Sequence, residues 1–236
     1  MTTAKMNGIQ LSSTNVSQHV KGTLQSDLSD LARIEIKSDD PLDLFKEWHE
    51  DARKYSTATP DALCLATVSK DLKVSARHLL LRHYDKRGFV IVTDSRSRKC
   101  RELAEVPNAA MCILWSYIND RQEHISRQVR IEGNIEQLLP DEFQYLYDRE
   151  PLFCKIRSHL CFQDKAIDWD EHKMRHDKLM HEVRTENKEL PMPDHFTAYR
   201  LSPDLMEYYF ARDHLIADRL LFKKEFKTWT HQRIAA

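Results

Sequence analysis

Cationic side chains gather in the stretch from Val74 to Leu103. Five of them lie at strand ends or at a helix start: Arg77, Arg82, Arg96, Arg98 and Lys99. The first two belong to a strand-like run, and the other three precede or open a helical segment. Guanidinium groups and the free backbone amides of a helix start both suit a phosphate group. The stretch therefore predicts a phosphate site, with a solvated basic edge as an equal alternative on local sequence alone.

The elements that would position these cations follow from residue periodicity. Residues 75–82 alternate with the period of a strand, residues 85–88 form a turn that ends at Gly88, and residues 89–93 are rich in strand-forming types. Glycine suits that turn because it tolerates positive φ. Residues 94–99 then lead into a helical segment over 100–104. The pattern predicts a strand, a tight turn, a second strand and a helix start.

Tyr145 and Arg149 form a second candidate pair. They are four residues apart in a helical segment that begins at Pro140, so they share one face of that helix. A phenol beside a guanidinium is able to hold a phosphate. The rim of an ordinary amphipathic helix is an equally good interpretation of the spacing.

The histidines and cysteines give little support to metal or nucleophile chemistry. His172 and His176 stand at i, i+4 on a helix, but no HExxH sequence is present, and a solvated helix surface is the favoured interpretation. Cys154 and Cys161 flank His159, which we interpret as structural. No GxSxG elbow is present to argue for a catalytic triad. We therefore predict no metal site and assign no catalytic residue.

Composition limits the class of protein. The chain has 236 residues, 41% of them hydrophobic, which fits one ordinary globular domain. Its net charge of −1 gives no support to nucleic-acid binding, and no run approaches the roughly 18 apolar residues of a membrane span. Its 5 cysteines are an odd number without a CxxC pair, which favours reduced thiols and a cytoplasmic location. The chain has only 4 glycines, and this low number excludes Gly-rich phosphate loops.

The order of elements predicts an antiparallel, mainly β fold with flanking helices. Residues 1–38 are expected to be a mobile arm, and residues 39–236 the folded domain, whose first helix starts at Asp39-Asp40-Pro41. We predict strands over 62–68, 73–82, 89–93, 109–115, 128–138, 196–201, 205–210, 219–224 and 226–232. Residues 116–127 are expected to be a long mobile loop, 156–167 to be irregular, and 169–186 to be a surface helix. Such a sequence of strands suggests a barrel.

Several motifs together resemble one known family. They are DPLDLFKEW (40–48), ATV (66–68), SARHLLLR (75–82), GFVIVTDSRSRK (88–99), REL (101–103), RQVRIEG (127–133) and PMPDHFTAYRLSP (191–203), with Tyr145, Arg149, Gln163, Glu207 and Asp218-Arg219. In this order and near-spacing, they resemble the pyridoxamine 5′-phosphate oxidases. The resemblance covers about four-fifths of the chain.

The resemblance implies an FMN-binding split β-barrel that forms a homodimer, with FMN at the subunit interface and residues from about 190 to 236 in dimerisation. The residues that it places on the cofactor are Arg77, His78, Leu79, Leu80, Leu81, Arg82, Val92, Thr93, Arg98, Lys99, Gln128, Gln163, Tyr209 and Arg219. Arg98 and Lys99 match the residues that bind the FMN phosphate. This expectation agrees with the phosphate site suggested by the cations alone.

The family oxidises pyridoxamine or pyridoxine 5′-phosphate to pyridoxal 5′-phosphate, with oxygen as the acceptor. The residues that match its substrate-phosphate site are Arg82, Tyr145, Arg149 and Cys154. The chain departs from the family at several positions. Arg82 stands where the family has a lysine, and Cys154 where it has a serine. Leu215 and Ala217 replace an arginine and a histidine on the substrate side, and Asp164 replaces a serine.

These departures leave two hypotheses. The first is an FMN-dependent oxidase of vitamin B6 phosphates. The second is a catalytically impaired relative that binds FMN or pyridoxal 5′-phosphate as a carrier or sensor. Leu215 and Ala217 favour the second hypothesis, and the retained phosphate-binding motifs are compatible with both.

Overall fold

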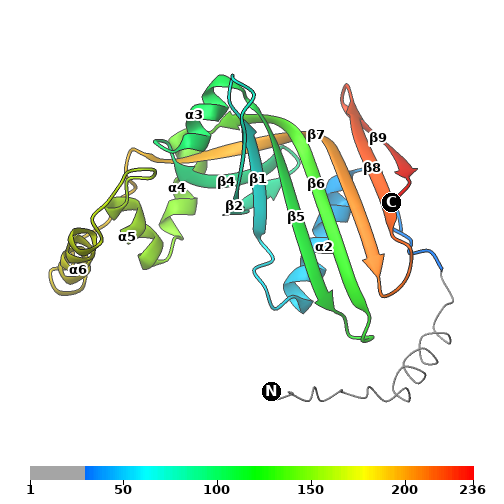
Figure 1. Cartoon of the computed structure of the whole chain (residues 1–236), viewed down its shortest axis with the longest axis horizontal. Helices are drawn as coiled ribbons and strands as arrows, with labels where there is room; N and C mark the ends of the chain where they lie inside the picture. Colours follow the sequence, from blue (N-terminus) through cyan, green and yellow to red (C-terminus); the bar gives the residue numbers. More distant parts are fainter. Residues whose placement is uncertain (1–29) are drawn as a thin grey trace, which may run out of the picture.

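The computed structural model describes residues 30–236, which form one antiparallel sheet flanked by helices (Figure 1). The strands are β1 (Ala62–Val68), β2 (Val74–Leu80), β3 (His83–Asp85), β4 (Gly88–Asp94), β5 (Asn108–Ile118), β6 (His124–Gln137), β7 (Phe196–Arg212), β8 (Asp218–Glu225) and β9 (Thr228–Ile234). The helices are α2 (Pro41–Tyr55), α3 (Arg98–Glu105), α4 (Pro140–Asp148), α5 (Leu152–Leu160) and α6 (Trp169–Thr185). The strand order is β2-β1-β5-β6-β7-β4-β3, with β8 and β9 added beside β7.

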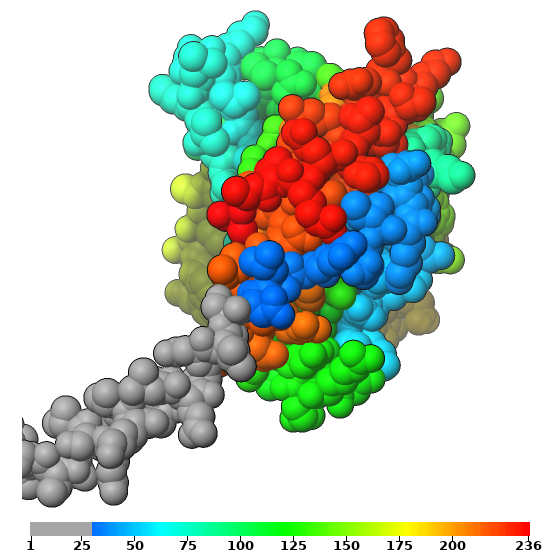
Figure 2. All heavy atoms as spheres, turned by 90° about the vertical axis from the view of Figure 1, so that its right-hand side faces the viewer, coloured from blue at the N-terminus to red at the C-terminus, as the bar shows by residue number. Residues whose placement is uncertain are grey.

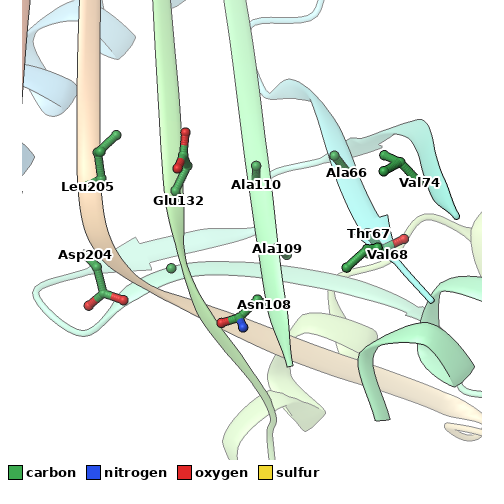
Figure 3. A pocket seen from close by; sticks show the side chains of 11 residues that line it. Ala66, Thr67, Val68, Val74, Asn108, Ala109, Ala110, Glu132, Asp204 and Leu205 are labelled. Atoms are coloured by element: carbon green, nitrogen blue, oxygen red, sulfur yellow. The ribbon is translucent and has the colours of Figure 1, made fainter. Parts of the chain in front are cut away.

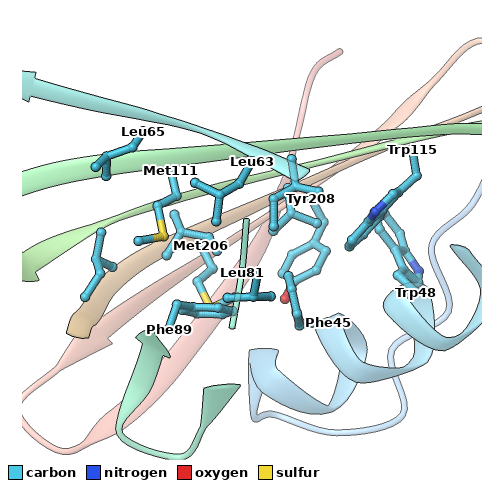
Figure 4. Close-up of a cluster of buried hydrophobic side chains, with 14 of the residues drawn as sticks. Phe45, Trp48, Leu63, Leu65, Leu81, Phe89, Met111, Trp115, Met206 and Tyr208 are labelled. Atoms are coloured by element: carbon cyan, nitrogen blue, oxygen red, sulfur yellow. The ribbon is translucent and has the colours of Figure 1, made fainter. Parts of the chain in front are cut away.

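The sheet has one buried face and one open face, because successive strand residues point to opposite sides. On β1, Leu63 and Leu65 are buried, and they belong to the same cluster as Met111 of β5 and Met206 of β7. Figure 4 shows these side chains together on one side of the strands. The residues between them, such as Cys64, face the other way and are only partly covered.

Helix α2 closes the buried face. Asp40 caps its start by accepting a hydrogen bond from the Leu42 amide, and Pro41 occupies its first turn. Phe45 and Trp48 then enter the core, where Trp48 packs edge-on against Tyr208 at 5.1 Å between ring centroids. The predicted helix start is confirmed.

Residues 30–38 run along the C-terminal strands. Ala32 donates a backbone hydrogen bond to Ile216, and the Ile34 amide donates to the Asp218 carboxylate at 2.7 Å. Figure 2 shows this segment, in blue, beside the orange and red C-terminal strands. The remainder of the predicted arm, residues 1–29, lies outside the described residues, and the domain boundaries stay predictions.

Two predicted connections are wrong. Residues 116–127 are not a long loop: β5 continues to Ile118 and β6 begins at His124, so that only a short turn joins them. The polar residues of this hairpin lie on its more exposed face. Their number made the segment resemble a loop in the sequence. Residues 156–160 belong to the helix α5 rather than to an irregular segment, because Pro151 supplies a helix start that the sequence analysis did not use.

The strand predicted over 73–82 is divided. β2 ends at Leu80 and pairs only with β1, whereas β3 begins at His83 and pairs with β4. β2 and β3 therefore lie at opposite ends of the strand order, and Leu81 and Arg82 connect them. The same short stretch thus contributes residues to two separate parts of the molecule.

Gly133 generates a stability prediction. A Cβ at this position would lie 2.1 Å from the Ser202 backbone oxygen, at a register shift between β6 and β7. We expect Gly133→Ala to lower the free energy of unfolding by about 2 kcal/mol or more, since backbone atoms must move apart. Urea denaturation measures it.

The control for this prediction is Ala110→Gly on the neighbouring strand β5. It should cost no more than about 1 kcal/mol, the usual penalty for glycine within a strand. Unchanged stability of Gly133→Ala would contradict the tight approach of the two strands.

Candidate active site

A cavity of about 350 Å³ lies beside the start of α3. Five of the residues predicted to contact FMN line it: Leu79, Val92, Thr93, Lys99 and Gln163. They come from β2, β4, α3 and the segment after α5, and Arg157, Ser158 and Cys161 add a wall from α5 and its end. The structure therefore gathers predicted residues that are distant in sequence around one hollow.

Lys99 is the buried cation of this cavity. Its side chain is 3% exposed, and its ammonium donates to Thr93 Oγ1 and Ser97 Oγ at 3.0 Å and to Gln163 Oε1 at 3.3 Å. All three acceptors are neutral, and within residues 30–236 Lys99 forms no ion pair with a carboxylate. Burial lowers the pKa of Lys99, because the charged form loses hydration. A phosphate group would supply the missing negative charge.

A buried carboxylate, Glu102, organises the two arginines beside this lysine. Glu102 Oε1 accepts from Arg98 Nε at 2.7 Å, and Glu102 Oε2 lies 3.4 Å from Arg77 Nη2. Thr67 and Ser75 also donate to Glu102. Burial alone would raise the pKa of Glu102, but the hydrogen bonds from Thr67, Ser75 and Arg98 outweigh it and lower the pKa to about 2.

A second acid stands at the start of α3. The backbone amide of Arg98 donates to Asp164 Oδ2 at 2.9 Å, and Arg101 lies 3.6 Å from the same oxygen. The amide is one of the free donors that suit an anion at a helix N-terminus. Asp164 therefore accepts from one of the donors of the predicted phosphate site. Lys99 is the cation of that site that has no carboxylate partner among residues 30–236.

Other predicted cofactor residues lie on the open face of the sheet. Leu114, Gln128, Tyr209 and Arg219 stand directly opposite one another on β5, β6, β7 and β8. His78 joins this face through Cys64 and Cys112, and so does Leu80, two residues further along β2. Leu79, by contrast, pairs with the buried Leu63. The predicted cofactor residues are thus divided between the two faces.

The predicted substrate-phosphate residues form a third group. Arg82 pairs with Glu150 at 2.7 Å between Nη2 and Oε1, and Cys154 is buried. Tyr145 and Arg149 are exposed, with the Arg149 guanidinium 6.0 Å from the Tyr145 ring centroid. Their link to Arg82 is its neighbour His83, whose ring lies 6.5 Å from that of Tyr145. Leu81, predicted to lie beside the cofactor, is 5% exposed in the core.

A separate hollow of about 460 Å³ opens on the other side of the sheet (Figure 3). Small side chains of β1 and β5 line it, with Glu132 and Asp204 at one end. It contains none of the residues predicted to contact FMN or substrate. We assign it no role in the candidate active site.

Sequence reasoning missed three acids that the structure places at the predicted anion sites. Glu102 had a usable signal, since it follows Arg98 by four residues on a helix. Asp164 stood out only as the replacement of a family serine. Neither the contact of Asp164 with Arg98 nor that of Glu150 with Arg82 had a signal, because these partners are distant in the sequence. Only the fold brings these charges together.

Comparisons with known proteins decide the family. The family model described as pyridoxamine 5′-phosphate oxidase matches residues 50–157. A protein of Microcystis aeruginosa named pyridoxine/pyridoxamine 5′-phosphate oxidase is 33% identical over 215 residues, which cover 90% of this chain and 95% of that protein. The chain belongs to the pyridoxamine 5′-phosphate oxidase family. A relative of the same name from Coxiella burnetii is 32% identical over 208 residues, covering 86% of this chain and 98% of the relative.

Solved structures agree with this family. PhzG from Burkholderia lata 383, in complex with tetrahydrophenazine-1-carboxylic acid, has a TM-score of 0.76 and 25% identity, covering 88% of this chain and all of that chain. A pyridoxamine 5′-phosphate oxidase-related, FMN-binding protein from Nostoc punctiforme has a TM-score of 0.63 at 16% identity, covering 82% and 96% of the two chains, and shows the fold alone. The predicted family and split-barrel fold are confirmed, and the family supports FMN as the cofactor.

Among residues 30–236, no helix combines the length and the apolar character that a membrane crossing would need.

The buried Glu102 yields a pH prediction. Its pKa falls from an ordinary 4.5 to about 2 on folding, so its ionised form stabilises the protein above about pH 5, and that stability is lost as the pH falls toward 2. We expect the free energy of unfolding of Glu102→Gln to be about 3 kcal/mol lower than that of the wild type at pH 7. The gap should narrow steadily in denaturation curves taken from pH 5 to pH 2.

Glu105→Gln, at the exposed end of the same helix, is the matched control and should show no such pH-dependent gap. A gap for Glu102→Gln that stays constant with pH would contradict the stabilising role of the ionised carboxylate.

Proposed function

We propose that this chain is an FMN-dependent oxidoreductase that converts pyridoxamine or pyridoxine 5′-phosphate to pyridoxal 5′-phosphate, with oxygen as acceptor. The observation that carries the cofactor assignment is Lys99, a buried cation with only neutral partners in a cavity lined by residues predicted for FMN. Burying a charge without a counter-charge is costly, and an anionic ligand removes that cost. Family membership supplies the reaction class.

The residues present fit FMN. Lys99 and the donors at the start of α3 would hold the phosphate, with Arg77 and Arg98 kept in place by Glu102. Thr93 and Gln163, which already accept from Lys99, would fix the orientation of its ammonium. When bound, FMN supplies hydride acceptance and electron transfer to oxygen. The protein's own part is to bind, orient and neutralise.

A homodimer would complete the site. Gln128, Tyr209 and Arg219 lie on the open face, away from the buried side to which Leu79 points. That open face also exposes large apolar side chains: Leu114 is 64% exposed and Ile118 is 49% exposed. Exposed apolar surface of this kind is typical of an interface. A second copy of the chain would cover it and bring its open-face residues to the cavity of its partner.

The substrate phosphate would be held by Arg82, Tyr145, Arg149 and Cys154. Leu215 and Ala217 provide no charge or imidazole to orient the reacting end of the substrate, which should slow the oxidation. These two residues favour a second candidate, a protein that binds FMN or pyridoxal 5′-phosphate as a carrier or sensor. The two candidates differ in turnover rather than in ligand.

Turnover of the purified protein separates them. We would load the protein with FMN and add pyridoxamine 5′-phosphate under air, following aldehyde absorbance and peroxide. Formation of both products supports the oxidase. If the protein is yellow but forms neither product, and the substrate does not bleach its flavin without oxygen, the result supports the carrier or sensor. A colourless protein that takes up no FMN defeats both candidates.

Lys99→Met tests the cofactor site without reliance on turnover. Loss of the ammonium should weaken FMN binding roughly 100-fold, as expected for a buried charge-assisted contact to phosphate. In the FMN-free state, the variant should be at least as stable as the wild type, because the uncompensated cation is gone. Flavin fluorescence titration and thermal unfolding measure the two effects.

Lys86→Met, in the exposed turn before β4, removes the same charge away from the cavity and should leave both quantities unchanged. If Lys99→Met bound FMN within threefold of the wild-type affinity, the phosphate site would lie elsewhere.

A further inference from the structure

The ion pair between Arg82 and Glu150 is nearly buried. Arg82 Nη2 and Glu150 Oε1 are 2.7 Å apart, and only 24% of the Arg82 side chain and 4% of the Glu150 side chain are exposed. At this distance and burial the pair is an ion pair that solvent screens poorly. Arg82 is therefore already neutralised by the protein itself.

The second oxygen of this carboxylate lacks a donor. Glu150 Oε2 is buried and has no hydrogen-bond partner among residues 30–236. Burial, and then the neighbouring Glu150 carboxylate, raise the pKa of the Cys154 thiol. Within residues 30–236, Arg82 is the only cationic partner of Glu150, and removing Arg82 would leave a buried charge without a counter-charge in this part of the chain.

Arg149, the residue before Glu150, is in the opposite situation. It is exposed, stands beside the Tyr145 ring, and forms no ion pair within the described part of the chain. Of the two arginines predicted to hold a substrate phosphate, only Arg149 is free to do so. A phosphate that reached Arg82 would have to displace the Glu150 carboxylate. A fully ionised phosphate carries no proton, so it could not donate a hydrogen bond to Glu150 Oε2.

We propose that Glu150 is a specificity-determining residue that competes with the substrate phosphate for Arg82. The inference rests on the proposed function, in which Arg82, Tyr145 and Arg149 form the phosphate site. Its consequence is a site that binds phosphate esters weakly and discriminates little between a phosphorylated B6 ligand and its dephosphorylated form. Replacing the carboxylate by an uncharged side chain should restore the preference for phosphate.

Calorimetric titration of the FMN-loaded protein tests this inference without turnover. The probes are pyridoxal 5′-phosphate and pyridoxal, which differ only in the phosphate. Glu150→Gln should bind pyridoxal 5′-phosphate roughly tenfold more tightly than the wild type, since Arg82 is released from a charged partner. Its affinity for pyridoxal should be unchanged.

Asp148→Asn is the matched control. Asp148 is exposed, lies at the end of α4, and accepts from Gln144 rather than from an arginine. This variant removes the same charge from the same neighbourhood, so a general electrostatic effect would appear in both variants. We expect a change of less than about twofold for Asp148→Asn, as solvent screens an exposed charge.

A double variant, Arg82→Leu with Glu150→Leu, guards against a folding defect. Replacing both members of a buried ion pair by apolar residues is often tolerated. Because the gain of Glu150→Gln depends on the release of Arg82, the double variant should not show that tenfold gain in affinity for pyridoxal 5′-phosphate. Arg149→Ala in the wild-type background should weaken that binding roughly tenfold.

The outcomes separate this inference from the proposed function. Failure to take up FMN defeats the proposed function. With FMN bound, an unchanged or weakened affinity of Glu150→Gln for pyridoxal 5′-phosphate overturns the role of Glu150. So does a wild type that already binds pyridoxal 5′-phosphate at least 100-fold more tightly than pyridoxal, because such a preference requires Arg82 to be available. Absence of binding by both proteins overturns it as well.

Discussion

Each strand of this sheet presents successive side chains to opposite faces, and that alternation determines where the predicted site can form. Leu79 points to the buried side and contributes to the cavity near Lys99, whereas Leu80 points to the open face. Neighbours in the sequence are therefore separated by the thickness of the sheet. In the proposed homodimer, a second chain would present its open face to a cofactor that contacts both sets. The exposed apolar residues on that face fit the same arrangement.

Buried acids control the cations of the site. Glu102 holds Arg77 and Arg98, and Glu150 holds Arg82. Lys99 alone among the predicted phosphate cations of the cavity has only neutral partners. A buried cation is far more costly than a paired one, so Lys99 is where an anionic ligand gains most. The difference between a held and a free cation, rather than the number of cations, identifies the phosphate position.

The sequence predicted those elements whose pattern is local. The strand 62–68 matches β1 because buried and partly covered residues alternate along it, and α2 begins at the predicted cap. The hairpin of β5 and β6 was predicted too short, because polar residues such as Ser116 and Ser126 alternate with the buried Tyr117 and Ile125 near its end. The division between β2 and β3 was also missed. β2 pairs with β1 and β3 pairs with β4, and these pairings depend on the whole fold rather than on the local sequence.

The candidate site shows the same limit. Motifs identified Lys99, Thr93 and Gln163, and the structure gathers them around one cavity. The pairing of Arg82 with Glu150 joins residues that are distant in the chain, so neither spacing nor composition predicts it. The family resemblance did not reveal this pairing either, since Glu150 is an acid of this chain and Arg82 stands where the family has a lysine.

Subunit complementation tests the central claim, that one site is built from two chains. Lys99→Met alters the cavity, and Arg219→Met alters the open face, so each variant alone should bind little FMN. After subunit exchange, heterodimers contain one site with both halves intact, and the mixture should recover about a quarter of the wild-type FMN capacity. A mixture that binds no more FMN than the separate variants would contradict the account.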